Sequence, residues 1–218
     1  PQTVIAVLTV HSRVEEAGLF GFEGSGKTFT ASLLAIGLHH HIKSQKPVAF
    51  FDTETGSDYV KPLFDKAKVP LVVYKSRALA QLGEAIQEAE GAADIMILDS
   101  LTHVYNEVMG AYVKKKKDGT NYVRMPDWQP IKEAWRKYFA VPYVNSKIHF
   151  IWCCRAKNIY EDMPDEQATE QTGRQQFKPV QVGTGARAET ESAFEPSILI
   201  EMSKEFVDQG HCFVLFSA

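Results

Sequence analysis

The sequence has few of the features that mark secreted or membrane-bound proteins. It contains only three cysteines, Cys153, Cys154 and Cys212, and an odd number with an adjacent pair is a poor disulfide framework. No apolar run approaches the roughly 18 to 20 residues of a membrane span, and the start of the chain lacks the basic residues of a signal peptide. We therefore expect a cytoplasmic protein with no membrane partner, whose cysteines are small buried residues on strands.

The chain also lacks an internal repeat, a low-complexity segment and a Pro/Gly/Ser-rich linker. With 218 residues, of which 44% are hydrophobic, it can bury one sizeable core, so a single α/β domain over residues 1–218 is expected. A strong charge of one sign is absent as well. The net charge of −3 excludes a surface that is basic throughout, so any patch that binds nucleic acid must be local.

The most informative segment that is present is GFEGSGKT, which matches the G-x-x-x-x-G-K-[ST] pattern of a phosphate-binding loop. Glycines let backbone N–H groups surround an anion, the lysine reaches the β and γ phosphates, and the hydroxyl binds Mg²⁺. An apolar strand pattern precedes the loop, and a helical pattern over residues 28–39 follows it, so the phosphates lie at a helix N-terminus. The residues expected to bind the nucleotide are Gly21, Phe22, Glu23, Gly24, Ser25, Gly26, Lys27 and Thr28.

The run His39–His41 falls at the end of this expected helix. A solvated helix end, or a partner for the C-terminal end of the helix dipole, explains the run better than a metal cluster.

Three further apolar runs, at 47–51, 94–98 and 148–154, are each followed by polar residues. Helical patterns at 78–90 and 128–139 lie between them, so strands and helices alternate and the sheet is expected to be mostly parallel and flanked by helices. Ligands of such sheets bind at the carboxyl ends of the strands. Glu54, Asp99 and Arg155 are therefore predicted to converge on the phosphate-binding loop.

Two of these residues have predicted roles in chemistry. Asp99 follows an apolar strand in the Walker B arrangement and is expected to hold Mg²⁺ opposite Thr28, although a helix N-cap is the alternative. Glu54 is expected to polarise the water that attacks the γ phosphate, with a surface carboxylate in a turn as the alternative.

At this point the sequence resembles the RecA family, which carries its catalytic glutamate and Walker B aspartate in segments like 49–54 and 97–100. It is most similar to small phage-encoded RecA-core ATP-binding proteins, some of which are single-strand annealing recombinases. That similarity covers most of the chain and includes the segments 99–102, 128–135, 151–155, 183–191 and 195–202. It implies a RecA-like ATPase that uses ATP and Mg²⁺, with Asp58 at the adenine amino group and Tyr59 stacking nearby.

The sequence departs from the family at several positions. In the family, the positions of Gly185 and Arg187 are usually lysines that reach the nucleotide of a neighbouring subunit. Only Arg187 keeps the positive charge in this sequence. At the end of the expected strand 148–154, this sequence lacks the glutamine that acts as a sensor in the bacterial recombinase. Arg155 is the nearest polar residue, and it is either a γ-phosphate sensor or part of a structural ion pair. No N-terminal oligomerisation segment is visible and the chain stops inside an expected strand, 212–216, so we expect a natural chain that is longer at one or both ends.

Two long polar segments, 106–127 and 156–184, occupy the places of the two loops that recombinase-like proteins direct toward the filament axis. Their cations neutralise phosphates, and Tyr122 and Phe177 offer faces for stacked bases. A solvated helix end is the alternative for the lysine run. The residues expected to bind DNA are Lys114, Lys115, Lys116, Lys117, Arg124, Arg174 and Lys178.

The leading hypothesis is an ATP-dependent recombination protein that binds single-stranded DNA, hydrolyses ATP when stimulated by DNA, and assembles into a ring or filament. A single-strand-binding protein is a further candidate partner, and a phage-encoded chain would act in the host cytoplasm. The alternatives are a nucleoside or nucleotide kinase, which needs a lid rich in arginine, and an ATP-bound assembly or regulatory module with vestigial hydrolysis.

Overall fold

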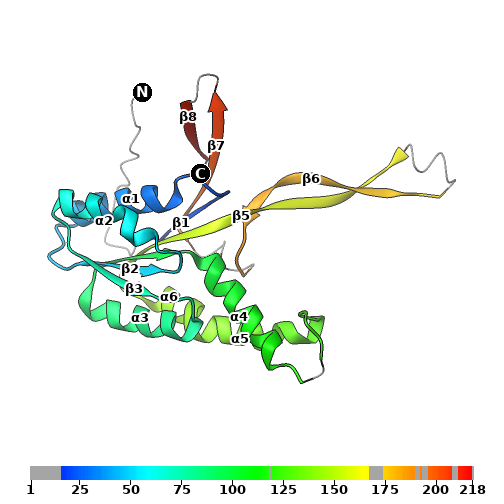
Figure 1. The fold of residues 1–218 in the computed structure, drawn as a ribbon, viewed down its shortest axis with the longest axis horizontal. Helices are drawn as coiled ribbons and strands as arrows, with labels where there is room; N and C mark the ends of the chain where they lie inside the picture. The colour runs from blue at the N-terminus through cyan, green and yellow to red at the C-terminus, as the bar shows by residue number, and fades with distance from the viewer. Residues whose placement is uncertain are drawn as a thin grey trace.

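The computed structural model describes residues 16–117, 119–166, 174–189, 192, 196–207 and 211–217. Its elements in chain order are β1 (Glu16–Gly21), α1 (Lys27–His41), β2 (Val48–Asp52), α2 (Gly56–Ala67), β3 (Leu71–Lys75), α3 (Leu79–Ala92), β4 (Ile95–Asp99), α4 (Leu101–Lys115), η1 (Met125–Asp127), α5 (Trp128–Trp135), η2 (Arg136–Ala140), α6 (Val141–Asn145), β5 (His149–Pro164), β6 (Phe177–Ala186), β7 (Ile198–Val207) and β8 (His211–Ser217). Figure 1 shows a sheet with helices on both faces and two hairpins that project beyond it.

The sheet has the strand order β3-β2-β4-β5-β1-β7-β8, and β6 pairs with β5 outside this path. Neighbouring strands from β3 to β7 run parallel, whereas β5–β6 and β7–β8 are antiparallel. Because β5 lies between β1 and β4, the strand before the phosphate-binding loop is not adjacent to the strand that ends at Asp99. This topology confirms the predicted α/β, RecA-like core.

The core has two layers because alternate side chains of a strand point to opposite faces. In β4, Ile95 and Ile97 pack in the cluster under α1 and α2, while Met96 and Leu98 pack in the cluster that α3, α4, α5, η2 and α6 cover. Burial of both faces explains why the strand sequences are almost continuously apolar. The buried free thiols of Cys153 and Cys154 on β5 agree with the expectation from the sequence.

The segment 106–127 is more regular than expected. α4 continues to Lys115, because the buried Leu101 and Val104 and the partly buried Tyr105 and Val108 give the helix an apolar face that packs on the core. The prediction of a long loop was therefore wrong for residues 106–115. Asp118, within the predicted segment, lies outside the described residues.

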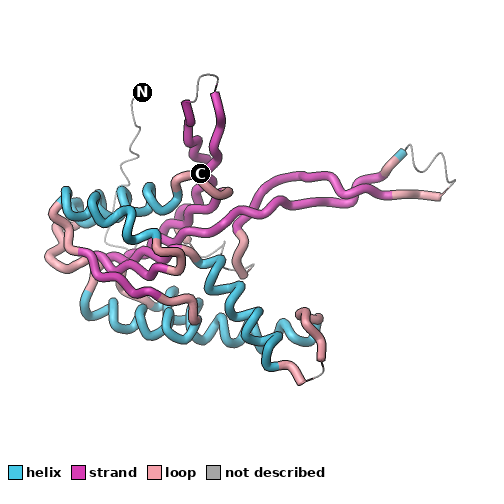
Figure 2. The backbone as a smooth tube through the Cα atoms, in the orientation of Figure 1, coloured by secondary structure: helices cyan, strands magenta, loops and turns pink. Residues whose placement is uncertain are grey.

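The prediction of an irregular loop over 156–184 was also wrong where the chain is described. β5 continues to Pro164 and pairs with β6 from Phe177 onward, with an irregularity of register between Ile159 and Tyr160. This β5–β6 ribbon extends far from the core (Figures 1 and 2). Its outer residues are mostly exposed, so they lack the apolar run that identified the buried strands.

Two further elements and several positions outside the described residues complete the comparison with the expected fold. β3 and α2 were not anticipated, whereas β8 confirms the expected strand at 212–216. Thr190, Glu191 and Glu195, which belong to segments that carry the family resemblance, lie outside the described residues, and so does Glu170 of the second polar segment. Among the described residues, no helix is long and apolar enough to span a membrane.

Candidate active site

The phosphate-binding loop connects β1 to the first turn of α1, as predicted. Gly24 and Gly26 have φ values of 76° and 86°, in the left-handed region that favours glycine, so the tight path of the loop depends on these two residues. Lys27 and Thr28 open α1, which directs the orphan N–H groups of the helix toward the loop. The local geometry is therefore that of an anion site.

The Lys27 ammonium lies inside the loop. Its Nζ donates hydrogen bonds to the carbonyl oxygens of Gly21 and Phe22, both at 2.9 Å, and to Ser25 Oγ at 3.3 Å. Burial lowers the pKa of Lys27, while Asp99 and Glu54 act in the opposite direction. Phosphate oxygens are stronger acceptors than carbonyls, so the ammonium is already placed to exchange its loop partners for a phosphate chain.

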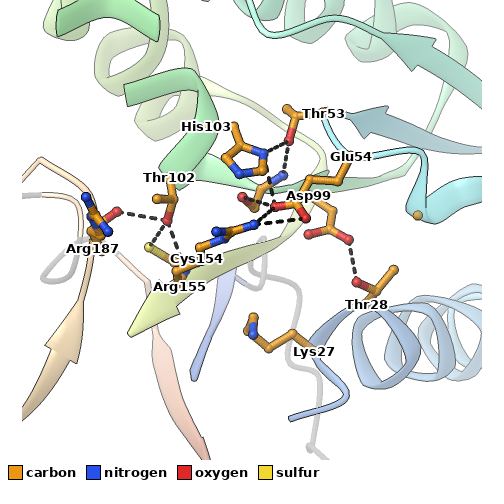
Figure 3. A network of polar contacts seen from close by, with 12 residues as sticks. Lys27, Thr28, Thr53, Glu54, Asp99, Thr102, His103, Cys154, Arg155 and Arg187 are labelled. Atoms are coloured by element: carbon orange, nitrogen blue, oxygen red, sulfur yellow. Dashed lines mark hydrogen bonds and ion pairs between the residues drawn. The ribbon is translucent and has the colours of Figure 1, made fainter. Parts of the chain in front are cut away.

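Thr28 and Asp99 meet across the loop. Thr28 Oγ1 donates a hydrogen bond of 2.6 Å to Asp99 Oδ2 (Figure 3). Asp99 is buried at the end of β4, and burial raises its pKa to about 6, against the effect of the Thr28 hydrogen bond. A carboxylate and a hydroxyl oxygen are ligands that suit Mg²⁺, and a cation would offset the buried negative charge, so these two residues fit the predicted metal.

Glu54 lies in the turn between β2 and α2. The Asp52 carboxylate accepts hydrogen bonds from the backbone N–H groups of Glu54, Gly56 and Ser57, and thereby fixes this turn. β2 is paired with β4, with Asp52 opposite Asp99, so the turn lies beside the end of the Walker B strand. The register of the sheet thus brings Glu54 and Asp99 to one edge, as expected from the sequence.

The Glu54 carboxylate has partners on two other elements. Arg155 Nη2 is 3.3 Å from each of its oxygens, and His103 Nδ1 is 3.0 Å from Oε1 (Figure 3). Ser100 Oγ also donates to Oε1, at 3.4 Å. Arg155 was predicted to lie near the phosphate-binding loop, whereas His103, on the first turn of α4, was not predicted to contact Glu54. No motif in the sequence marks His103, because its proximity to Glu54 depends on the pairing of β2 with β4.

The backbone around this network is also tied together. Thr53 Oγ1 accepts the Ser100 N–H at 2.8 Å and lies 3.1 Å from His103 Nδ1. The buried Thr102 hydroxyl accepts the Arg155 N–H at 2.9 Å and donates to the Arg187 carbonyl at 2.9 Å. The polar residues at the ends of β2, β4 and β5 therefore form one connected cluster.

A cleft of about 380 Å³ is lined by Lys27, Thr28, Glu54, Asp99 and Arg155, among others. Part of its wall is apolar and comes from α1 and α2. Phe29, Tyr59 and Val60 form this part, and only Tyr59 had been named from the sequence. Asp58 instead pairs with Lys75, whose Nζ is 2.9 Å from both carboxylate oxygens, at an exposed place outside the lining of the cleft. Its contact with adenine stays a prediction.

Arg187 follows β6 at the base of the ribbon. Its backbone is fixed because its N–H donates to the Arg155 carbonyl at 2.7 Å, and its side chain is exposed. Gly185 lies two residues earlier, on β6, where it pairs with Lys157 of β5. The contact predicted between this segment and the nucleotide of a neighbouring subunit stays a prediction.

The predicted DNA-binding lysines differ from one another in their surroundings. Lys114, Lys115 and Lys117, the α4-end lysines, are exposed. Lys116 instead forms a buried ion pair with Asp127, with Nζ and Oδ2 2.5 Å apart. Its side chain is 7% exposed, so the structure gives Lys116 a local role in this ion pair, and its contact with DNA phosphates stays a prediction. The same Asp127 carboxylate caps the short helix η1, because its Oδ2 accepts a hydrogen bond of 2.8 Å from the Arg124 backbone N–H.

The second predicted DNA segment is the β5–β6 ribbon. Lys178 on β6 is exposed, and its Nζ lies 3.8 Å from Asp165 Oδ2. Arg174, just before β6, is also exposed. Large apolar side chains are exposed along the same ribbon, namely Ile159, Tyr160, Met163, Phe177 and Val182.

The His39–His41 run ends α1, and the buried His39 has Nε2 2.9 Å from the Lys46 carbonyl oxygen. This contact agrees with a structural role at the helix end.

The fold and the cleft define a RecA-like P-loop core with a candidate nucleotide-binding site. No family model and no curated protein matches the sequence. Among solved structures, the chain is similar to the flagellar accessory protein FlaH from Methanocaldococcus jannaschii, with a TM-score of 0.44 and 13% identity over 93% of this chain and 76% of that one. A similarity this distant gives no information on substrate or partner, so the class rests on the topology and the cleft themselves.

Proposed function

We propose that this chain is an ATP-dependent recombination protein that binds single-stranded DNA and hydrolyses ATP with Mg²⁺. The observation that supports hydrolysis best is the position of Glu54, in the same cleft as the phosphate-binding loop and the Thr28–Asp99 pair. A carboxylate is a competent general base when it lies within reach of a water aligned with the γ phosphate.

In this proposal the loop N–H groups and Lys27 hold the β and γ phosphates. Thr28 and Asp99 hold Mg²⁺, which when bound neutralises phosphate charge. Glu54 accepts a proton from the attacking water as the water oxygen bonds to the γ phosphorus. The bond from that phosphorus to the β–γ bridging oxygen breaks, and ADP and phosphate leave. Arg155 turns from Glu54 to the γ phosphate, where its charge stabilises the transition state.

The proposed DNA contacts come from two elements that start at the cleft. α4 follows β4, the ribbon continues β5, and β4 and β5 are neighbouring parallel strands, so both elements leave the core from one edge of the sheet (Figure 1). The α4-end lysines and Lys178 supply exposed cations, and Tyr122 and Phe177 supply exposed aromatic faces. Such a combination favours binding to single strands without sequence preference.

We also propose that the chain acts as a homo-oligomer in which Arg187 contacts the nucleotide of a neighbouring subunit. Its exposed side chain and fixed backbone support this role. Arginine is suited to such a contact because its guanidinium forms bidentate bonds with phosphate.

The test is ATP hydrolysis with Mg²⁺, measured with and without single-stranded DNA of mixed sequence. We expect hydrolysis that single-stranded DNA stimulates and that chelation of Mg²⁺ abolishes. Duplex DNA serves as the matched control, and a mixture of nucleosides tests the kinase alternative. Absence of hydrolysis in the presence of DNA, or transfer of phosphate to a nucleoside, contradicts the proposal.

A further inference from the structure

We infer that His103 is a positioning residue for Glu54, whose Nδ1 holds one carboxylate oxygen so that the other oxygen is presented to the attacking water. This inference rests on the proposed hydrolysis of ATP and deepens it. It assigns a role to a residue that the sequence motifs did not select.

The contacts of the two carboxylate oxygens are unequal. Glu54 Oε1 lies 3.0 Å from His103 Nδ1, and Ser100 Oγ donates to the same oxygen at 3.4 Å. Among the described residues, the hydrogen bond to Oε2 comes from Arg155 Nη2, which also bonds to Oε1. Glu54 is therefore held on the Oε1 side by α4 and its preceding residue, and on both oxygens by the arginine.

The proton on the imidazole can be located from the same distances. A carboxylate oxygen 3.0 Å from a ring nitrogen needs a hydrogen between them, because two lone pairs at this distance repel. Burial lowers the pKa of His103, with Arg155 and Arg77 acting in the same direction and Glu54 in the opposite one, so the ring is neutral at neutral pH. Its single proton is then on Nδ1, which faces Glu54 Oε1 at 3.0 Å and Thr53 Oγ1 at 3.1 Å. Of these two oxygens the charged carboxylate is the stronger acceptor, so we assign the hydrogen bond to Glu54.

The need for this contact follows from the two demands on Arg155. Arg155 Nη2 lies 3.3 Å from both Glu54 oxygens, and in the proposed mechanism this side chain turns from Glu54 to the γ phosphate. When Arg155 turns to the phosphate, Glu54 loses the partner of Oε2, and that oxygen becomes available to take a proton from water. Oε1 keeps His103, whose ring is only 16% exposed and is carried on the first turn of α4. A base held in this way needs little reorganisation before reaction.

Three substitutions at position 103 separate positioning from structure. In His103→Asn the amide nitrogen lies near the place of Nδ1 and can still donate to Glu54. In His103→Gln the amide lies near the place of Nε2, which is the wrong place, and His103→Ala removes the donor altogether. The Asn and Gln variants are matched in polarity, so a difference between them reports the position of the donor.

The measurement is ATP hydrolysis with Mg²⁺ and saturating single-stranded DNA, as kcat and KM, together with thermal unfolding of each variant. We expect kcat of His103→Gln and His103→Ala to fall about tenfold to a hundredfold, the size expected for misplacing a catalytic group by about 1 Å. The KM for ATP should stay within about twofold, since His103 does not contact the nucleotide site. His103→Asn should keep kcat within about threefold of the parent.

A double-mutant cycle gives the second readout. If His103 acts through Glu54, His103→Gln should cause little further loss of kcat in a Glu54→Gln background, because residues that act as a unit are strongly non-additive. Equal kcat for His103→Gln and the parent overturns the inference, and so does a full additional loss in the Glu54→Gln background. A loss in His103→Asn as large as in His103→Gln also overturns it. A parent protein that does not hydrolyse ATP overturns the proposed function and this inference together.

Discussion

Replacing Glu54 by glutamine removes the proposed base while keeping the shape of the side chain. In the structure, Oε1 accepts from His103 and Arg155. In the Glu54→Gln variant the amide oxygen can take over these hydrogen bonds, and the amide nitrogen in the place of Oε2 no longer accepts the hydrogen bond from Arg155. That nitrogen has no lone pair available for a proton from water. The substitution therefore separates the holding of the side chain from the chemistry.

The expected loss of hydrolysis rate follows from the two interactions that the substitution changes. Loss of a positioned general base lowers the rate by about 10² to 10⁴, which corresponds to about 2.7 to 5.4 kcal/mol of activation free energy. Loss of the charge on the Glu54–Arg155 pair has a far smaller effect, about 0.2 to 1 kcal/mol, because both side chains are partly exposed. Without this ion pair, Arg155 is free to contact the γ phosphate, so ATP affinity should not weaken.

The assay is single-turnover hydrolysis at saturating ATP and Mg²⁺, with the dissociation constant of ATP measured by calorimetry. We expect the hydrolysis rate to fall at least a hundredfold and ATP to remain bound at parental affinity. A turnover equal to that of the parent would mean that Glu54 is only a turn residue. Weakened ATP binding with unchanged turnover would contradict the separation of roles as well.

Two further substitutions test the nucleotide and DNA contacts. Lys27→Ala should reduce ATP affinity below detection in calorimetry, because it removes the charge-assisted bond to the phosphates from a site otherwise built of neutral dipoles; an unchanged dissociation constant would refute the phosphate-binding loop. Replacing the α4-end lysines with alanine should weaken single-stranded DNA binding equally for all sequences and lower the log–log salt slope by about 0.7 for each phosphate that is no longer neutralised. ATP affinity should not change, and Lys116 is kept because it pairs with the buried Asp127. An unchanged slope would assign these lysines to a solvated helix end.

The parts of the fold that could be predicted are those in which burial determines the sequence. β4 and the core part of β5 are buried on both faces, and their apolar runs identified them together with the polar residues that follow. The loop from Gly21 to Thr28 was predictable because a phosphate cradle restricts the residue type at several fixed positions. The convergence of Glu54 and Asp99 followed from the rule for parallel sheets.

The parts that could not be predicted depend on pairing between distant or exposed residues. The outer β5–β6 ribbon is stabilised by backbone pairing between exposed side chains, which leaves no apolar run to detect. Lys116 was grouped with its neighbours because a run of lysines gives no indication that the chain folds back to Asp127. His103 has no motif of its own, and its proximity to Glu54 arises only because β2 and β4 are adjacent.

The way in which α4 and the ribbon are joined to the cleft gives a physical reason to expect stimulation by DNA. The Thr102 hydroxyl, buried at the start of α4, accepts the Arg155 N–H and donates to the Arg187 carbonyl. Arg155 directly precedes the part of β5 that pairs in the ribbon, and Arg187 directly follows β6. A single buried side chain thus connects the helix that carries the α4-end lysines to both strands of the ribbon. Because close-packed protein interiors transmit strain, we expect DNA bound to either element to alter the placement of Arg155, which in the proposed mechanism turns from Glu54 to the γ phosphate.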